Sequence, residues 1–435
     1  MEVLFLFSKR ILCTQLSAHI GSEVSLAGWL QQVRQVGRQL AFWIVRDRSG
    51  WTQVVVSGQL AQSAPPLESV VAVTGQAVAS RSPQGYELQA TNVQVITTAA
   101  ELPFELHHGE IKAGDEQVFN HRVLSLRHNR NQAIFRVKAV ALQAYRAYLS
   151  RAGFLEVQTP KIVATGTEGG AELFPVQYFN RPAYLAQSPQ FYKQMLVAAG
   201  FERVFEVGPV FRAESHDTSR HTNEFTSLDL EMGFINSVDT LMELETELLK
   251  HMFTTVRQEC ARELELLGAN LPELDHIPRI SLAEAQAILK QEHGHLSPQG
   301  NLDPAGEKLL CQYAQQEWGS PLVFVTDYPT AVRPFYTRTH CDTPELTHSF
   351  DLLFRGLEIT TGGLRIHKHE QLVQALRERN LEPEAYRFYL QAFTHGAPPH
   401  GGFAIGLERL TARMLELPNV RQATLFPRDR QRLVP

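Results

Sequence analysis

Cysteine is scarce in this sequence, and long apolar runs are missing. The four cysteines stand far apart, without the spacing of a zinc site, a redox pair or a disulfide framework. No stretch of about 18 apolar residues occurs, so no segment is suited to spanning a membrane. The apolar start, Met1 to Leu6, precedes the charges of Lys9 and Arg10, the reverse of a signal peptide. These absences predict a cytoplasmic protein with reduced, structural thiols.

A surplus of positive charge is also missing. Lys and Arg number 41 against 46 Asp and Glu, and the net charge is −5. Charge alone therefore does not indicate a nucleic-acid-binding protein. What is present is ordinary globular material, because 43% of the residues are hydrophobic and the 435 residues suffice for two or three domains.

The first hundred residues predict a small all-β domain. Runs rich in Val, Ile, Trp and Tyr alternate with Gly, Ser, Asn and Pro, which mark turns. Five short strands in this length are typical of a Greek-key barrel such as the OB-fold, with a sandwich as the alternative. The strands are expected over residues 24–36, 40–46, 51–56, 70–79 and 86–97.

A polar stretch over residues 101–130 separates this domain, 1–100, from the rest of the chain, 131–435. It contains Pro103 and a His107-His108 pair, which we interpret as part of a solvated hinge and not as a metal site.

The second domain mixes helices and strands. Apolar residues recur at three- and four-residue steps over 133–152, where Asn131 can cap the start and Gly153 the end. A longer helix is expected over 239–267. Antiparallel strands with helices packed around them make this domain α+β. Further strands are expected over 154–157, 204–206, 226–234, 322–326 and 357–361, and further helices over 383–393 and 408–417.

A strand ending at Phe211 leads into a charged loop that begins with Arg212. The loop also carries Glu214, Arg220 and His221, and the return strand brings Phe225, Asp229 and Glu231. Residues two apart in a strand share a face, so the two acids lie together. Cations at one end and acids on the return strand suit a substrate that bears both phosphate and ammonium.

A glycine-rich segment, 401–410, joins a strand to a helix near the end of the chain. Glycine permits close approach of the backbone to a ligand. Arg409 falls in the first turn of that helix, where the helix dipole does not favour a cation but an anion would compensate it.

Between these two segments stand Asp351, Glu358 and Thr361. Two carboxylates and a hydroxyl beside a phosphate site suit Mg²⁺, which binds few protein oxygens and completes its shell with phosphate. Arg365 follows a Gly-Gly pair and could grip a substrate carboxylate with its fork of donors. Upstream, a Glu168 loop precedes a helix start with Gln190 and Lys193 on one face, a set able to bind an amino acid.

Together these segments resemble the class II aminoacyl-tRNA synthetases. Pro160 after a helix and a strand is similar to motif 1, residues 211–231 to motif 2 and 401–410 to motif 3. The segment Gln187 to Gln194 and the Glu168 loop are similar to aspartyl-tRNA synthetases of the archaeal and eukaryotic type. The bacterial type carries a large extra domain, for which this chain has no room.

The resemblance implies ATP-dependent activation of L-aspartate and its transfer to tRNA. Arg212 would hold the α-phosphate of ATP and Arg409 the γ-phosphate, and Phe225 would stack on adenine. Glu358 and Thr361 would hold Mg²⁺ with help from Asp351, although the family usually has Ser where Thr361 stands. The remaining ATP contacts implied are Ala213, Glu214, Arg220, His221, Thr222, Gly406, Leu407 and Glu408.

For the amino acid, the resemblance implies that Lys193 and Arg365 bind the side-chain carboxylate. Glu168, Gln190 and Asp229 would surround the ammonium group, with Arg212 and Thr361 also near the aspartate. The family is dimeric through motif 1, so a homodimer is expected. No protein nucleophile is implied, and catalysis would consist of positioning and charge stabilisation.

The first domain would then bind the tRNA anticodon, with Arg34, Phe42 and Gln53 at the family's contact positions. Members that accept only the aspartate tRNA tend to carry Trp where Gln31 stands and Lys where Pro83 stands. Both are missing, so we expect tRNA(Asn) to be aspartylated as well as tRNA(Asp), with an amidotransferase needed to convert the product.

Two alternatives stay open. An asparagine-specific tRNA ligase or an asparagine synthetase-like paralogue would share the motifs, but Lys193 favours a carboxylate over an amide. A catalytically dead, RNA-binding paralogue would not be expected to keep both arginines and the Mg²⁺ carboxylates.

Overall fold

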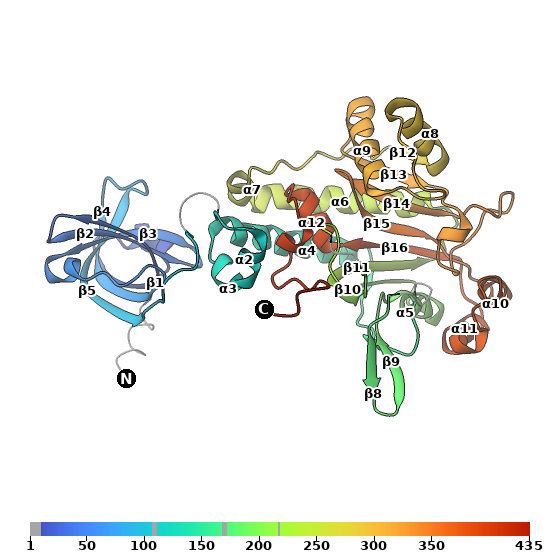
Figure 1. Ribbon diagram of the computed structural model, residues 1–435, viewed down its shortest axis with the longest axis horizontal. Coiled ribbons are helices and arrows are strands. Elements are labelled where there is room, and N and C mark those ends of the chain that lie inside the picture. Colours follow the sequence, from blue (N-terminus) through green and yellow to red (C-terminus); the bar gives the residue numbers. More distant parts are fainter. Residues whose placement is uncertain (1–9, 107–110, 168–171, 216–217) are drawn as a thin grey trace. The chain divides into compact units, whose positions relative to one another are not determined.

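The computed structural model describes residues 10–106, 111–167, 172–215 and 218–435 (Figure 1). The chain divides into two compact units, Met1–Val118 and Phe119–Pro435. Each unit has its own apolar core.

The first unit is a closed barrel with strand order β1-β2-β3-β5-β4. Neighbouring strands are antiparallel except β3 and β5, which are parallel. The prediction of five strands and a barrel is therefore confirmed, and the sandwich is excluded because the sheet closes on itself. The elements are η1 (Cys13–His19), β1 (Glu23–Val36), β2 (Leu40–Asp47), β3 (Gly50–Ser57), η2 (Gly58–Gln62), β4 (Val70–Ala79) and β5 (Tyr86–Thr97).

Alternation of side chains explains the barrel. Along β2 the buried residues Ala41, Trp43 and Val45 point into the barrel, and the residues between them face outward. The inward set of all five strands forms one apolar cluster that includes Leu26 and Val73.

The predicted hinge is not structureless, since it contains α2 (Asp115–Asn120) and α3 (Arg122–Ser125). Phe119 is buried there, and the guanidinium carbons of Arg122, Arg421 and Arg432 lie 5.2, 5.4 and 5.8 Å from its ring centroid. These contacts tie the short helices to the end of the chain, which a polar stretch of sequence does not reveal.

The second unit is built on an eight-stranded sheet with strand order β12-β13-β14-β15-β16-β11-β10-β6. Only the outermost pairs, β12 with β13 and β6 with β10, are parallel. The predicted α+β class is confirmed. The strands are β6 (Leu155–Glu156), β10 (Arg203–Phe211), β11 (Glu224–Gly233), β12 (Arg279–Ser281), β13 (Leu322–Thr326), β14 (Ser349–Phe354), β15 (Leu357–Leu364) and β16 (His400–Gly406).

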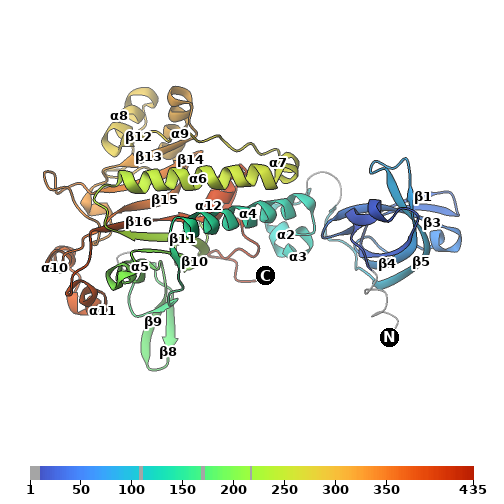
Figure 2. The same cartoon turned by 180° about the vertical axis from the view of Figure 1, so that it is seen from behind.

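Two long helices, α4 (Asn129–Arg151) and α6 (Asp239–Glu259), lie across one face of this sheet (Figure 2). Their apolar sides form the main core with the sheet, including Tyr145, Phe253 and Phe205. Burial of this face holds the strands that carry the site residues in a fixed register.

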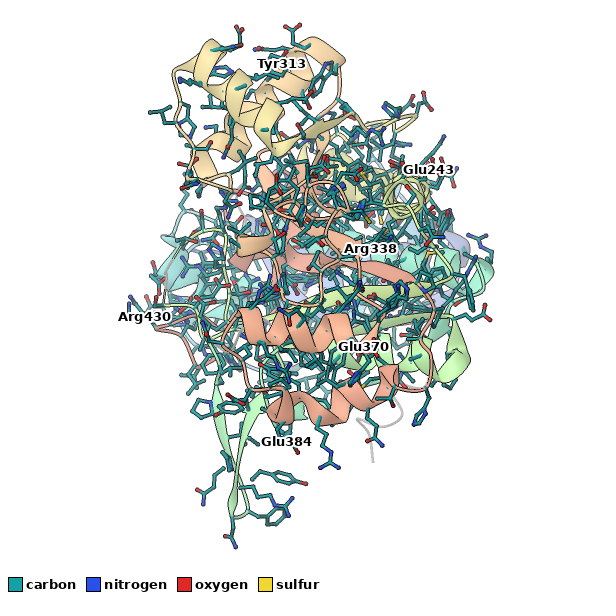
Figure 3. All side chains as sticks on the ribbon, turned by 90° about the vertical axis from the view of Figure 1, so that its right-hand side faces the viewer. Glu243, Tyr313, Arg338, Glu370, Glu384 and Arg430 are labelled. Atoms are coloured by element: carbon teal, nitrogen blue, oxygen red, sulfur yellow. The ribbon has the colours of Figure 1, made fainter. Side chains whose placement is uncertain are left out.

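Smaller elements surround the sheet. Figure 3 shows the α8–α9 pair, marked by Tyr313, and the segment with α10 and η5, marked by Glu370 and Glu384, at opposite ends of the unit. The remaining elements are β7 (Ile162–Val163), β8 (Pro175–Tyr178), β9 (Arg181–Leu185), α5 (Gln190–Leu196), η3 (Val197–Phe201), α7 (Ala261–Leu267), α8 (Leu282–His293), α9 (Pro304–Trp318), η4 (Thr330–Val332), α10 (His369–Glu378), η5 (Pro383–Tyr386), α11 (Arg387–Leu390), η6 (Gln391–Phe393), α12 (Leu407–Met414) and η7 (Val420–Ala423).

Three local predictions were wrong in detail. The helix expected over 239–267 breaks into α6 and α7 at Cys260, whose backbone has φ −121° and ψ 28°. The helix α4 begins earlier than expected, and the His128 side chain accepts the cap hydrogen bond from the Arg130 N–H, while Asn131 donates to the Ser125 carbonyl. The helix expected over 383–393 consists of three short turns.

All four cysteines are free, as predicted. Burial raises the pKa of Cys260 to about 11 and that of Cys311 to about 12. Cys13 is buried as well, but Cys341 is exposed, so the structural interpretation fails for that thiol. In the described part of the chain, no helix is long and apolar enough to cross a membrane.

Candidate active site

Four neighbouring strands bring the predicted site residues into one row. Asp351 pairs with Thr361, Thr361 with Ala404, and Ala404 with Asp229, across β14, β15, β16 and β11. Residues more than a hundred positions apart in sequence therefore lie side by side on the sheet. Two groups of polar side chains gather along this row.

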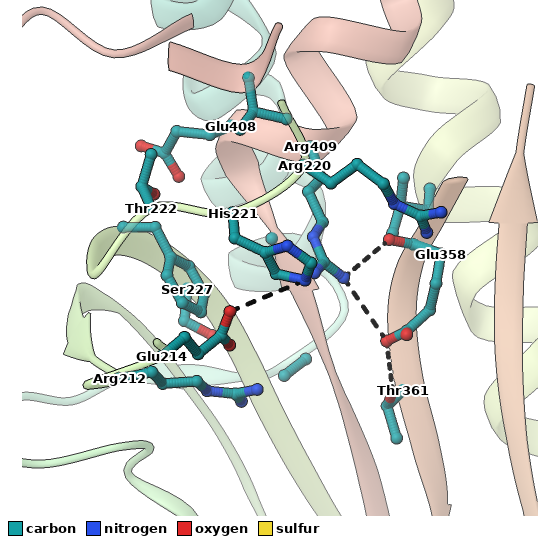
Figure 4. Close-up of a pocket in the computed structure, with 15 residues that line it drawn as sticks. Arg212, Glu214, Arg220, His221, Thr222, Ser227, Glu358, Thr361, Glu408 and Arg409 are labelled. Carbon is teal, nitrogen blue, oxygen red and sulfur yellow. Dashed lines mark hydrogen bonds and ion pairs between the residues drawn. The ribbon is translucent and has the colours of Figure 1, made fainter. Parts of the chain in front are cut away.

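The first group lines a pocket between the charged loop after β10 and the start of α12 (Figure 4). It unites most residues that the sequence predicted for ATP. The lining residues are Arg212, Glu214, Arg220, His221, Thr222, Phe225, Ser227, Glu358, Ile359, Thr361, Ala404, Gly406, Glu408, Arg409 and Val420. Ala213 and Leu407, also predicted, do not line it.

Two arginines give this pocket a positive lining. The Arg212 guanidinium lies 5.6 Å from the Phe225 ring centroid, and its buried Nε has no hydrogen-bond partner within the described residues. Arg409 stands in the first turn of α12, and its Nη1 donates to the Glu358 carbonyl at 3.1 Å. An unsatisfied buried donor is costly, and an anion in the pocket would satisfy it.

Glu358 and Thr361 lie together at the edge of the pocket, where the Thr361 hydroxyl donates to the Glu358 carboxylate at 2.9 Å. Burial would raise the pKa of Glu358, but Arg409 outweighs that effect and lowers it. Across the strand pair, an Arg333 nitrogen lies 2.8 Å from an Asp351 carboxylate oxygen. Burial raises the pKa of Asp351.

These oxygens fit a cation that takes few protein ligands. No group of three or more His, Cys, Asp or Glu side chains able to hold a metal occurs in the ranges that the structure describes. Mg²⁺ needs no such cage, since it binds one or two carboxylates together with substrate phosphates. Glu358 with the Thr361 hydroxyl, next to two arginines, meets that requirement.

Sequence reasoning missed Glu307 of α9. Its carboxylate accepts the Glu358 N–H at 2.8 Å and forms an ion pair with Arg220. Burial raises the pKa of Glu307 to about 7. The residue belongs to no motif of the pocket, so its position could be found only from the folded chain.

The second group surrounds the start of α5 and is almost wholly buried. Lys193 donates to the Asp229 carboxylate at 2.8 Å and lies 3.7 Å from Glu231. Arg365 donates to Glu231 at 3.0 Å and to the Gln190 side-chain oxygen at 3.3 Å. Five charged or amide side chains from four elements thus form one network.

Charge in this second group is balanced, with two cations facing two carboxylates. Burial would raise the pKa of Glu231, but Arg365 and Lys193 outweigh it, so the pKa lies below its usual value. The Glu231 acid was noticed in the sequence only as a neighbour of Asp229. Its role in holding Arg365 was not predicted. Glu168 lies outside the described residues.

The predicted anticodon residues lie on three adjacent strands of the barrel. Arg34 pairs with Phe42 across β1 and β2, and its guanidinium lies 4.7 Å from the ring centroid. Gln53 on β3 donates to the Glu87 carboxylate at 2.8 Å. Glu87 was not predicted, because a single acid in a strand carries no motif.

Gln31 and Pro83 occupy irregular positions of the same barrel. Gln31 stands at a bulge of β1, between the paired residues Leu30 and Gln32. Pro83 lies in the turn between β4 and β5, where the neighbouring Gln84 donates to the Trp51 carbonyl.

Comparison with known families places both units. Residues 114–430 match the family described as tRNA synthetases class II (D, K and N), and residues 24–96 match the OB-fold nucleic acid binding domain. The two matches follow the two units of the fold.

Full-length relatives agree with these matches. The chain is 48% identical to the aspartate–tRNA(Asp/Asn) ligase of Thermus thermophilus over 98% of this chain and 100% of the relative. It is 45% identical to the aspartate–tRNA(Asp/Asn) ligase of Aeropyrum pernix, with 96% of each chain covered. It is 42% identical to the aspartate–tRNA(Asp) ligase of Pyrococcus abyssi, with 95% and 97% covered.

Solved structures show the same fold. The asparaginyl-tRNA synthetase of Pyrococcus horikoshii with asparaginyl-adenylate has a TM-score of 0.91 at 31% identity, covering 98% of this chain and 99% of the other. The aspartyl-tRNA synthetase of Entamoeba histolytica has a TM-score of 0.87 at 29% identity, covering 98% and 93%. Overall shape therefore does not separate the aspartate enzymes from the asparagine enzymes.

Proposed function

The chain belongs to the class II aminoacyl-tRNA synthetases of the aspartate, lysine and asparagine group, and from that membership we propose how its sites carry out aspartate activation and transfer to tRNA. Its activity is that of an aspartate–tRNA(Asp/Asn) ligase, since full-length relatives at 44–48% identity bear that name. The observation that carries the site assignment is the row of residues on four adjacent strands, which sets an anion-binding pocket beside a buried network of charged side chains.

ATP binds in the pocket after β10. Arg212 binds the α-phosphate and Arg409 the γ-phosphate, while Phe225 stacks on adenine. The α-carboxylate of aspartate attacks the α-phosphorus, and pyrophosphate leaves. The 3′-hydroxyl of the terminal tRNA adenosine then attacks the aspartyl-adenylate and releases AMP. The arginines stabilise charge that develops on the phosphate in the transition state.

Mg²⁺ bound at Glu358 and Thr361, with Asp351 behind them, would neutralise charge on the phosphates. Thr361 supplies the same hydroxyl as the serine usual at this position. Glu307 supports the site by accepting the Glu358 backbone N–H and pairing with Arg220.

Aspartate binds in the buried network. Lys193 and Arg365 face its side-chain carboxylate, and Gln190, Asp229 and Glu168 its ammonium group. Lys193 is already paired with Asp229, so the preference for a carboxylate over an amide depends on Lys193 and Arg365 together. Two fixed cations favour a second carboxylate by charge complementarity.

The barrel binds the anticodon by stacking and base-edge contacts, through Arg34, Phe42 and Gln53. Gln31 and Pro83 relax the reading of the anticodon, so that both tRNA(Asp) and tRNA(Asn) are charged. Aspartyl-tRNA(Asn) is not a usable end product and calls for an amidotransferase. The chain acts as a homodimer through the segment around Pro160.

Two assays test these assignments. Pyrophosphate exchange with aspartate and with asparagine tests the substrate, and a preference for asparagine would instead identify an asparagine-specific ligase or an asparagine synthetase-like paralogue. Charging of purified tRNA(Asp) and tRNA(Asn) transcripts tests the tRNA range. Comparable rates support relaxed recognition, and a large preference for tRNA(Asp) refutes it. Sedimentation of the purified chain tests the dimer.

A further inference from the structure

The loop over residues 212–223 supplies five of the residues that line the ATP pocket. Its base is closed by hydrogen bonds between its two ends. Arg212 donates its N–H to the Asn223 carbonyl at 2.9 Å, and the Asn223 side-chain amide donates to the carbonyls of Arg212 and Glu214 at 2.8 and 3.2 Å. The base is therefore fixed, but the rest of the loop needs support from elsewhere.

Residues 419–435, which we name the clamp segment, provide that support at three points along the loop. The Val420 N–H donates to the Ser219 carbonyl at 2.9 Å, and the Asn223 N–H donates to the Arg428 carbonyl at 2.8 Å. Arg430 donates from Nη1 to the Ser215 carbonyl at 3.1 Å. One continuous segment thus holds the beginning, the middle and the end of the loop.

Arg430 is exposed and lies at the outer edge of the unit in Figure 3, so its contact by itself contributes little. The two backbone hydrogen bonds depend instead on the path of the clamp segment. That path must be set by contacts within the segment and beneath it.

Asp429 sets the path of the clamp segment. One carboxylate oxygen accepts the N–H groups of Gln431 and Arg432 at 2.9 and 2.8 Å, and the other pairs with Arg421 at 3.1 Å. The side chain joins the two halves of the segment, because Arg421 belongs to η7 and Asp429 follows Arg428, whose carbonyl holds the loop.

The clamp segment is anchored on the body of the unit. Arg122 donates to the carbonyls of Thr424 and Leu425, each at 2.8 Å, and Lys138 donates to the Ala423 carbonyl at 2.9 Å. Lys138 also pairs with Glu408 at 2.7 Å. The anchor therefore reaches from the connector helices to the helix that carries Arg409.

We propose that the clamp segment holds the loop 212–223 in its ATP-binding shape, and that Asp429 is the positioning residue that keeps the clamp segment in place. The proposal rests on the proposed function, because it assigns this loop to ATP. None of the clamp contacts described above involves Lys193 or Arg365. Loss of the clamp therefore weakens ATP binding and leaves aspartate binding largely intact.

The test compares Asp429→Ala, Asp429→Asn and Ser237→Ala with the parent chain in pyrophosphate exchange. Asp429→Ala is expected to raise KM for ATP about tenfold or more and to change KM for aspartate by less than about twofold. Asp429→Asn keeps a side-chain oxygen for the two N–H groups and is expected to restore most of the affinity. Ser237→Ala removes a cap hydrogen bond at α6 and serves as the control for lost stability alone.

Hydrogen exchange of the peptide spanning the loop gives a readout that needs no activity. Asp429→Ala is expected to speed exchange in the loop and not in β11. Unchanged exchange and an unchanged KM for ATP would overturn the proposal, as would an equal rise of both KM values. If Asp429→Ala does not fold, Asp429→Asn and Arg430→Gln decide by the same two measurements. Absence of aspartate-dependent exchange in the parent chain would refute the proposed function, while the hydrogen-exchange comparison would still judge the clamp.

Discussion

Lys193 has no exposed surface, although lysine is among the residues least often buried. Its ammonium group is held by Asp229 at 2.8 Å and by the Leu230 carbonyl at 3.3 Å. Breaking such a pair by removing one partner leaves the other charge buried and uncompensated. Affinity for a charged substrate at this position is therefore coupled to the integrity of the core.

Lys193→Gln is expected to lower kcat/KM for aspartate by about 100-fold or more, because removing one partner of a buried ion pair costs about 3–5 kcal/mol. KM for ATP should change little, and the melting temperature should fall. Lys250→Gln is the matched control, since its partner Asp275 is 98% exposed. A variant with parental efficiency would exclude Lys193 from aspartate binding.

Glu245 is a second buried charge, on α6 behind the sheet. Its carboxylate accepts a hydrogen bond from Thr360, and its other oxygen has no hydrogen-bond partner in the described ranges. Burial raises the pKa of Glu245 to about 8. The folded chain thus holds a proton that the unfolded chain releases near the ordinary pKa of 4.5.

The sign of the pH effect follows. Because the folded pKa is raised, the unfolded state binds fewer protons between pH 4.5 and 8, and stability declines as pH rises through that window. Glu245→Gln stays neutral and keeps the oxygen that accepts from Thr360. It should be more stable than the parent at pH 9 by on the order of a few kcal/mol, and nearly equal at pH 5.

Urea unfolding across this pH range measures the difference. Glu243→Gln, on the exposed side of the same helix, serves as the control and should show no such trend. A constant difference between Glu245→Gln and the parent at all pH values would contradict a raised pKa.

At the scale of elements, paired glycines let β15, β16 and β11 approach the buried network. Gly363 pairs with Gly402, and Gly402 also pairs with Glu231. A Cβ added at Gly402 would collide with the Leu230 carbonyl and the Glu231 carboxylate. The glycine is required by the acid beside it, and that acid orients Arg365.

Gly402→Ala is expected to reduce kcat/KM for aspartate about 100-fold, because Glu231 must move and Arg365 loses its fixed geometry. KM for ATP should change much less. Gly114→Ala is the control, since a Cβ there has no described atom within 4 Å. Equal losses for both substrates would indicate general disruption of the sheet instead.

Elements with one exposed face were predictable from the sequence. The barrel strands alternate buried and exposed residues, as in Gly50–Ser57, and their bounds were predicted within a residue or two. The strand β14, Ser349–Phe354, is buried at every position and shows no such alternation, so it was not predicted. The break at Cys260 has no Gly or Pro to mark it.

The same distinction applies to the site. Arg212, Glu358 and Arg409 stand in motifs, and the structure brings them into one pocket. Glu307 and Arg333 reach this region from segments without a motif, through contacts that only the tertiary fold creates. Motifs therefore identified the residues assigned to substrates and missed those that hold them.

At the scale of the whole molecule, the two units have separate tasks. The barrel carries the anticodon residues and the sheet unit carries the chemistry, and each has its own core. A change on the barrel surface should therefore alter the choice of tRNA without altering amino-acid activation.

The double variant Gln31→Trp with Pro83→Lys is expected to lower charging of tRNA(Asn) relative to tRNA(Asp) by about tenfold or more, as one base-specific contact contributes about 1–3 kcal/mol. Pyrophosphate exchange should be unchanged. Gln76→Trp, an exposed position on β4, is the control. An unchanged ratio would show that these two positions do not govern the choice.

The uneven burial of the cysteines offers a means of observing such changes. Cys13, Cys260 and Cys311 are buried, and Cys341 alone of the four is exposed, in the loop that follows the pairing of Thr337 with Arg365. A thiol-reactive dye should therefore attach to the native protein at a single position, near the aspartate network. The parent sequence thus already contains a site for a fluorescent reporter of substrate binding, and no engineered cysteine is needed.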